Sequence, residues 1–158
     1  MAVHVRLLVA GNSVQRQRFA RRSGGWQHIR FPATVALIEH PEHGSTLFDT
    51  GYAPRFREAT DPLPQRLYRW LVPVEFADAE SAVEQLEAFG VPADEVLTVV
   101  LSHLHMYHIG CAGLFPQATF VVRRSELRAA WWPDPYEHGY DFDGLLKMRH
   151  FTYLQLPD

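Results

Sequence analysis

The sequence is poor in several features that mark specialised classes of protein. Its 158 residues contain one cysteine, Cys111, and one lysine, Lys147. A single cysteine excludes an intrachain disulfide and fits a reducing compartment. The apolar stretch at residues 2–10 is too short to span a bilayer, and it lacks the basic leader and cleavage site of a secretory signal. We therefore expect a cytoplasmic protein without a membrane partner.

The weak net charge and the absence of certain motifs argue against several classes of function. The formal net charge of -3 gives no general attraction to nucleic acid. No Gly-x-Ser-x-Gly motif occurs and nothing around Cys111 signals an activated thiol, so serine and cysteine hydrolases lack support. A hydrophobic content of 47% is enough for a core. We expect residues 1–158 to belong to one domain.

Strand and helix patterns alternate along the chain. Residues 33–40 and 45–51 flank turn-forming residues and predict a β-hairpin. The polar, arginine-rich residues 12–31 predict a loop. This alternation is typical of a layered α/β or α+β fold. Apolar runs predict strands at 2–10, 33–40, 45–51, 95–102, 118–124 and within 149–158.

The clearest helix is predicted at residues 77–90. Asp78 is a candidate N-cap, and Gly90 suits the C-terminal stop. Pro54 and Pro64 suit the first positions of two short helices. Further helical patterns lie at 109–115 and 125–132, followed by a predicted loop at 133–144.

Three histidines follow a buried strand in the segment VVLSHLHMYHIG, residues 99–110. His103 and His105 point to the same side of an extended segment because side chains alternate with period two. A turn into a helix then brings His108 to the same centre. Imidazole suits zinc, iron, nickel or copper better than magnesium or calcium. The cluster predicts a metal site; the alternative is three unrelated polar residues at a strand end.

Four motifs together resemble the metallo-β-lactamase-fold hydrolase superfamily. They are LFDTG (47–51), GVPADEVLTVVLSHLH (90–105), HIG (108–110) and LFPQATFVVRRSE (114–126). The segment between 52 and 76 looks most like members that open N-acyl-homoserine lactones. The resemblance implies an αββα sandwich, of which this chain covers mainly the first β-sheet half with its flanking helices.

The resemblance also implies roles for individual residues. In that family the motif reads H-x-H-x-D-H, so His103 and His105 would hold a first metal and His108 a second. Asp49 would lie beneath the site and orient the ligands by accepting hydrogen bonds. Zinc is the expected metal, and iron or another divalent metal is the alternative. A metal-bound hydroxide would attack a small-molecule lactone or ester.

Tyr107 departs from that pattern because it stands where the family has Asp. A free phenol has a pKa near 10 and is a poor ligand when neutral. We expect one metal site rather than two, and no residue is a certain catalytic group. A phenolate bound to a strongly acidic metal such as ferric iron is the other possibility.

The chain ends at Asp158, about where the resemblance places the second half of the fold with three more ligand positions. We therefore expect the isolated chain to be weakly active or inactive. An uncovered sheet would favour a homo-oligomer or a second chain that supplies the missing half. The alternative function is a non-catalytic remnant or an interaction subunit.

Other polar and aromatic residues have mainly structural interpretations. Residues 66–76 mix aromatics with arginine and fit either an apolar substrate channel or core packing. The basic segment at 16–22 fits a solvated loop better than a steering patch. Solvated surface is also the favoured interpretation for the remaining candidates, which are His4, His28, His40, His43, His138, His150, Asp134, Asp141 and Asp143.

Overall fold

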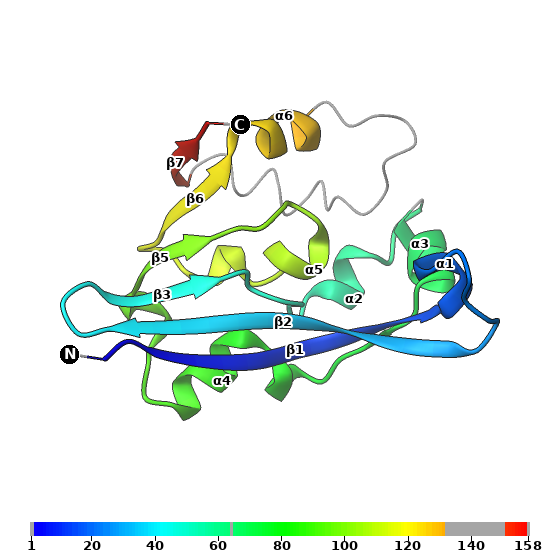
Figure 1. The fold of residues 1–158 in the computed structure, drawn as a ribbon, viewed down its shortest axis with the longest axis horizontal. Coiled ribbons are helices and arrows are strands. Elements are labelled where there is room, and N and C mark those ends of the chain that lie inside the picture. Colours follow the sequence, from blue (N-terminus) through cyan, green and yellow to red (C-terminus); the bar gives the residue numbers. More distant parts are fainter. Residues whose placement is uncertain (1, 64, 132–150, 158) are drawn as a thin grey trace.

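A mixed β-sheet with helices along it forms the framework (Figure 1). The computed structural model describes residues 2–63, 65–131 and 151–157. Within them the sheet has seven strands in the order β4-β1-β2-β3-β5-β6-β7. The strands are β1 (His4–Arg16), β2 (His28–His40), β3 (Gly44–Phe48), β4 (Val74–Glu75), β5 (Val96–Val100), β6 (Thr119–Arg123) and β7 (Thr152–Leu156).

The helices are short and lie between the strands in sequence. The α-helices are α1 (Gln17–Ala20), α2 (Phe56–Ala59), α3 (Gln65–Leu71), α4 (Ala82–Ala88), α5 (Met106–Ile109) and α6 (Arg124–Trp131). Single 3-10 turns are η1 (Asp78–Glu80), η2 (Ala93–Glu95) and η3 (Ala112–Leu114). No helix among the described residues is both long and apolar enough to cross a bilayer.

The strand order confirms the predicted hairpin and the overall fold class. β2 and β3 pair antiparallel, from Ala36 opposite Phe48 to His40 opposite Gly44. β3, β5, β6 and β7 then run parallel, with helical segments in the three connections. This is the mixed sheet with flanking helices expected of the first half of the sandwich.

The prediction of a loop at residues 12–31 is wrong. β1 continues past Gly11 to Arg16, and β2 already begins at His28. The strand continues past Gly11 because a β-bulge between Val9 and Asn12 shifts the register without ending the pairing with β2. Gly11 itself has a φ of 92°. Pairing with β2, rather than local hydrophobicity, holds this polar end of β1 in the sheet.

The predicted helix at 77–90 exists in two pieces, and its cap is Ser81 rather than Asp78. Ser81 Oγ accepts a hydrogen bond from the Glu84 amide at 3.3 Å, which satisfies one of the free N–H groups at the start of α4. Asp78 lies in η1 instead. Gly90 has a φ of 77°, as expected after a helix end.

One face of the sheet forms the core. Buried side chains follow the hydrogen-bonded register across neighbouring strands, so Leu37, Leu47, Val99 and Phe120 form one continuous row. Ala82 and Leu86 of α4 belong to the same cluster, as does Ala130 of α6. The helices therefore cover this face and fix the strand ends that carry the polar residues described below.

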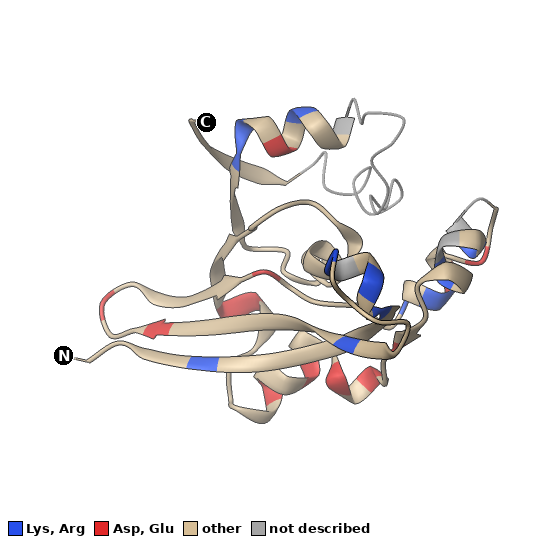
Figure 2. Ribbon diagram, turned by 45° about the vertical axis from the view of Figure 1, so that its right-hand side comes forward, with Lys and Arg blue, Asp and Glu red and all other residues tan. Residues whose placement is uncertain are grey.

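The opposite face carries a second apolar row that the described residues leave largely open. Pairing aligns Leu7, Ala36, Phe48, Val100, Val121 and Leu154 across six strands. Leu7 is 73% exposed and Leu154 is 56% exposed. The strands β3 and β5 in the middle of this row carry no charged residue (Figure 2).

Gly110 holds α5 against the loop that follows β3. A Cβ atom built at Gly110 would lie 2.5 Å from the Gly51 carbonyl oxygen and 2.8 Å from the Ala53 nitrogen. Both neighbours are backbone atoms that cannot rotate away. The close approach explains why the motif at 108–110 ends in glycine.

Gly110→Ala should therefore destabilise the fold by about 1–3 kcal/mol, the usual range for overpacking. Urea denaturation followed by circular dichroism measures this change. Gly113→Ala is the matched control, because a Cβ atom there meets nothing within 4 Å. Equal stability of the two variants would contradict the tight contact.

Candidate metal centre

The predicted histidines gather at the carboxyl end of β5. His103 and His105 lie in the segment between β5 and α5, and His108 lies within α5. The ring centroid of His103 is 4.6 Å from that of His105 and 4.0 Å from that of His108. The chain therefore brings together all three residues that the motif singled out.

A buried carboxylate anchors this cluster from the neighbouring strand. Asp49 directly follows β3 and is 3% exposed. Its Oδ1 accepts a hydrogen bond from the Ser102 amide at 2.8 Å. Its Oδ2 accepts one from Ser102 Oγ at 2.8 Å and lies 2.7 Å from His108 Nδ1. Asp49 thus lies beneath the histidines, where the resemblance placed it.

These contacts assign protons to the ring nitrogens. A carboxylate oxygen accepts only, so the Asp49 contact places the proton of neutral His108 on Nδ1. The Ser102 hydroxyl gives its proton to Asp49 and can therefore accept from His103 Nδ1, which lies 3.0 Å away. This arrangement leaves His103 Nε2 unprotonated, so that its lone pair can accept a hydrogen bond or bind a metal.

Asp49 adopts a backbone conformation that few residues tolerate. Its φ of 62° is the only positive value among the described non-glycine residues. Aspartate enters this left-handed region more readily than most residues, at an energetic cost that surrounding contacts must offset. The Asp49 amide donates to the Val100 carbonyl at 2.8 Å, which ties the strained turn to β5.

Thr50, the residue after Asp49, is bonded to the backbone of His108. The amide and the hydroxyl of Thr50 both donate to the His108 carbonyl, at 2.7 and 2.9 Å. Sequence reasoning missed Thr50 and Ser102. Only their positions in the sequence could have indicated them: Thr50 directly follows Asp49, and Ser102 directly precedes His103.

Tyr107 lies between the first two histidines. Its hydroxyl oxygen is 3.4 Å from His103 Nε2 and 3.3 Å from His105 Nδ1. Burial, and to a lesser degree the Asp49 charge, raises the pKa of the Tyr107 phenol. The side chain is therefore a neutral phenol in the metal-free chain at neutral pH.

The donor set fits a metal ion only in part. Two imidazole nitrogens converge on the Tyr107 oxygen, as the ligands of a zinc or iron centre must converge. His108 instead turns its Nδ1 to Asp49. Across the described ranges, no three His, Cys, Asp or Glu side chains group closely enough to hold a metal ion.

A pocket of about 300 Å³ opens beside Tyr107 and His108. Apolar groups of Phe31, Pro32 and Tyr52 form part of its wall. Its remaining lining residues are Ser13, Gln15 and Ala33. The pocket thus has mixed polarity and lies directly against the cluster.

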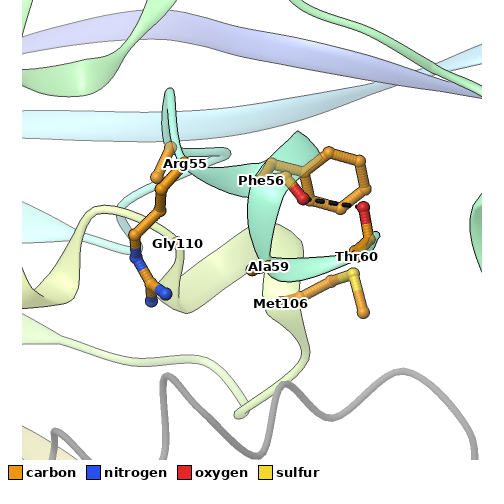
Figure 3. A pocket seen from close by; sticks show the side chains of 7 residues that line it. Arg55, Phe56, Ala59, Thr60, Met106 and Gly110 are labelled. Atoms are coloured by element: carbon orange, nitrogen blue, oxygen red, sulfur yellow. Dashed lines mark hydrogen bonds between the residues drawn. The ribbon is translucent and has the colours of Figure 1, made fainter. Parts of the chain in front are cut away.

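A second, smaller hollow lies between α2 and α5 (Figure 3). Figure 3 shows Arg55, Phe56 and Met106 around it, with the Thr60 hydroxyl donating to the Phe56 carbonyl at 2.7 Å. Apolar surface dominates this hollow, and the histidines do not line it. We regard it as a packing defect between two short helices.

The remaining candidates divide between surface, core and undescribed parts of the chain. Cys111 is fully buried and its thiol donates to the Tyr52 carbonyl, as expected of a core filler. Within 66–76, Phe76 packs on the buried Tyr52 cluster while Trp70 is 77% exposed. The predicted loop at 133–144 and the four candidates His138, Asp134, Asp141 and Asp143 lie outside the described residues, as does His150.

The fold and the aspartate-anchored histidine cluster define a class of protein. The family model described as the metallo-beta-lactamase superfamily matches residues 28–153. The chain belongs to this superfamily.

Individual relatives place it nearer one group. It is 38% identical over 129 residues to the N-acyl homoserine lactonase AttM of Azorhizobium caulinodans, a match that covers 76% of this chain and 46% of the relative. The chain therefore spans about half the length of that relative.

Solved structures share the fold over almost the whole chain. An N-acyl homoserine lactone hydrolase with N-hexanoyl-L-homoserine bound at its catalytic metal centre superposes with a TM-score of 0.81 and 22% identity. A mutant of AiiA from B. thuringiensis with N-decanoyl-L-homoserine at the active site superposes with a TM-score of 0.79 and 23% identity. Each match covers 99% of this chain and 61% of the solved chain.

His103 makes the metal-free chain sensitive to acid. Burial, followed by the neighbouring His108 and His105, lowers the pKa of His103 to about 4, and Asp49 only partly opposes this. The unfolded chain, with a His pKa of about 6.5, binds more protons between these values. The contribution of His103 to the free energy of unfolding therefore falls as the pH drops from about 6.5 to about 4.

Urea denaturation of metal-free protein at about pH 7 and about pH 5 tests this dependence. We expect His103→Gln to lose less stability than the wild-type chain between the two values. Equal losses in both proteins would show that His103 ionises as freely in the folded state as in the unfolded state.

Proposed function

We propose that this chain carries the metal-binding part of a metal-dependent hydrolase that acts on small lactones or esters. The observation that carries the proposal is that His103 Nε2 and His105 Nδ1 both approach the Tyr107 hydroxyl oxygen, in a cluster that the buried Asp49 anchors through His108. Membership of the superfamily and the 38% identity to a lactonase support the same class of reaction. The match spans less than half of that relative, so hydrolase activity is proposed for this chain and not carried over from the relative.

The metal would be zinc, with iron as the alternative, because both accept imidazole ligands. His103 and His105 would hold it. One metal rather than two fits the site, since Tyr107 brings no carboxylate to a second position and His108 is bonded to Asp49. When bound, such a metal polarises a carbonyl group and lowers the pKa of water.

Asp49, Ser102 and Thr50 would hold the histidine rings and α5 in place. Asp49 holds His108 directly and reaches His103 through the Ser102 hydroxyl. Such supporting hydrogen bonds fix ring orientation, and their loss typically costs 10–100-fold in metal affinity. Thr50 fixes the His108 carbonyl, so α5 cannot rotate independently of β3.

The pocket beside Tyr107 and His108 would receive the substrate. Its Phe31, Pro32 and Tyr52 walls suit an acyl group, and Ser13 and Gln15 offer hydrogen bonds to a polar head. A lactone or ester combines these two kinds of surface. The pocket would place its carbonyl close to the histidines.

A non-catalytic interaction subunit is the second candidate. The open apolar sheet face favours it, and so does the finding that no three His, Cys, Asp or Glu side chains of the described residues are grouped so as to hold a metal ion. The two candidates differ in metal content. An interaction subunit needs none, whereas the hydrolase retains metal after dialysis.

Zinc content per chain, measured by elemental analysis after stripping and reloading, is the test of the proposed function. We expect about one zinc per wild-type chain. His103→Ala should abolish retention, because the site then keeps a single imidazole. The control is His28→Ala, which removes an exposed histidine from the start of β2.

Hydrolysis of an N-acyl homoserine lactone and of a nitrophenyl ester would then be assayed on the reloaded proteins. Zinc-dependent turnover that disappears in His103→Ala supports the hydrolase. Absence of retained metal in the wild-type chain contradicts it and leaves the interaction subunit.

A further inference from the structure

We propose that Tyr107 supplies the third ligand of the metal, so that the site is a His-His-Tyr centre rather than a damaged copy of the family pattern. This inference rests on the proposed function, because it assigns a further ligand to the same metal. Its ligand atoms are His103 Nε2, His105 Nδ1 and the Tyr107 oxygen.

The spacing of these atoms carries the proposal. Two ligand atoms each bonded at about 2.0–2.1 Å to a tetrahedral metal lie about 3.3–3.4 Å apart. The Tyr107 oxygen lies 3.4 Å from His103 Nε2 and 3.3 Å from His105 Nδ1. Both contacts are longer than the usual hydrogen bond of about 2.8–3.0 Å. They match two edges of a coordination tetrahedron.

The surrounding contacts prepare the site for this use. His103 Nδ1 bonds to Ser102, so the nitrogen that faces Tyr107 is the unprotonated one, whose lone pair could bind a metal. The Tyr107 ring packs against its neighbours, with its centroid 4.3 Å from that of His108 and 6.3 Å from that of Tyr52. Three protein ligands would leave the fourth position open, which is the pattern of a catalytic rather than a structural zinc site.

Binding would exchange a proton for the metal. The phenol O–H bond breaks, the proton passes to solvent, and an oxygen lone pair forms the bond to the metal. No oxidation or reduction takes place. A metal ion deprotonates its ligands in this way because its charge stabilises the anion at close range.

A different arrangement of the same atoms makes the opposite prediction. If the neutral hydroxyl only caps the two nitrogens, a metal must displace it. Removal of the hydroxyl would then strengthen metal binding. The sign of one substitution therefore decides between a ligand and a cap.

The experiment measures zinc affinity by competition with a chromophoric chelator for the wild-type chain and for Tyr107→Phe. We expect at least about 100-fold weaker binding in the variant, beyond the range for residues that only orient ligands. Tyr153→Phe on β7 is the matched control and should bind as the wild type does. Unchanged or tighter binding by Tyr107→Phe overturns the proposal.

Iron supplies a second readout that a structural role would not move. Ferric iron added to the wild-type chain should produce the visible charge-transfer absorption of a phenolate bound to iron. Tyr107→Phe should lack it, and Tyr107→His should bind zinc without it. A wild-type chain that binds iron without this absorption overturns the proposal, whereas a wild-type chain that retains no metal contradicts the proposed function itself.

Discussion

The buried carboxylate of Asp49 is the interaction on which the site depends. It joins the end of β3 to the end of β5 through Ser102 and to α5 through His108. A buried carboxylate is costly unless its oxygens are fully bonded. Three hydrogen-bond donors meet that requirement, and each of them comes from the segment that carries the histidines. The hydrogen bonds that the buried Asp49 requires therefore fix the position of the histidine cluster.

Parallel strand order explains why these residues meet. Asp49 and His108 are 59 positions apart, yet β3 and β5 are neighbours that point the same way. Residues that follow such strands arrive at the same edge of the sheet, which is where α/β folds place their sites. Asp49 has its strained φ at this edge of the sheet. The chain turns sharply as it leaves β3, and the Asp49 carboxylate accepts the hydrogen bond from the Ser102 amide.

Sequence reasoning was strongest where a local pattern and the final packing agree. The hairpin of β2 and β3, the strand β5 and the histidine cluster follow from apolar runs and turn residues. The loop assigned to 12–31 was wrong because the polar end of β1 owes its strand conformation to pairing with β2, which no local pattern records. Ser102 and Thr50 were missed for a related reason. Ser102 donates a hydrogen bond to Asp49, which is 53 positions away in sequence. Thr50 donates one to the carbonyl of His108, which is 58 positions away.

The closeness of His103, His105 and Tyr107 in sequence has a consequence for how a metal would act on folding. These three residues fall within five positions, so an unfolded chain can also wrap around an ion. A ligand stabilises a protein only to the extent that it prefers the folded state, and metal held by the unfolded chain subtracts from that gain. The preference must come from Asp49, which reaches the cluster only after β3 and β5 have paired. The metal affinity of the proposed site and the gain in stability on metal binding would thus be separate quantities, and the distant carboxylate would set the difference between them.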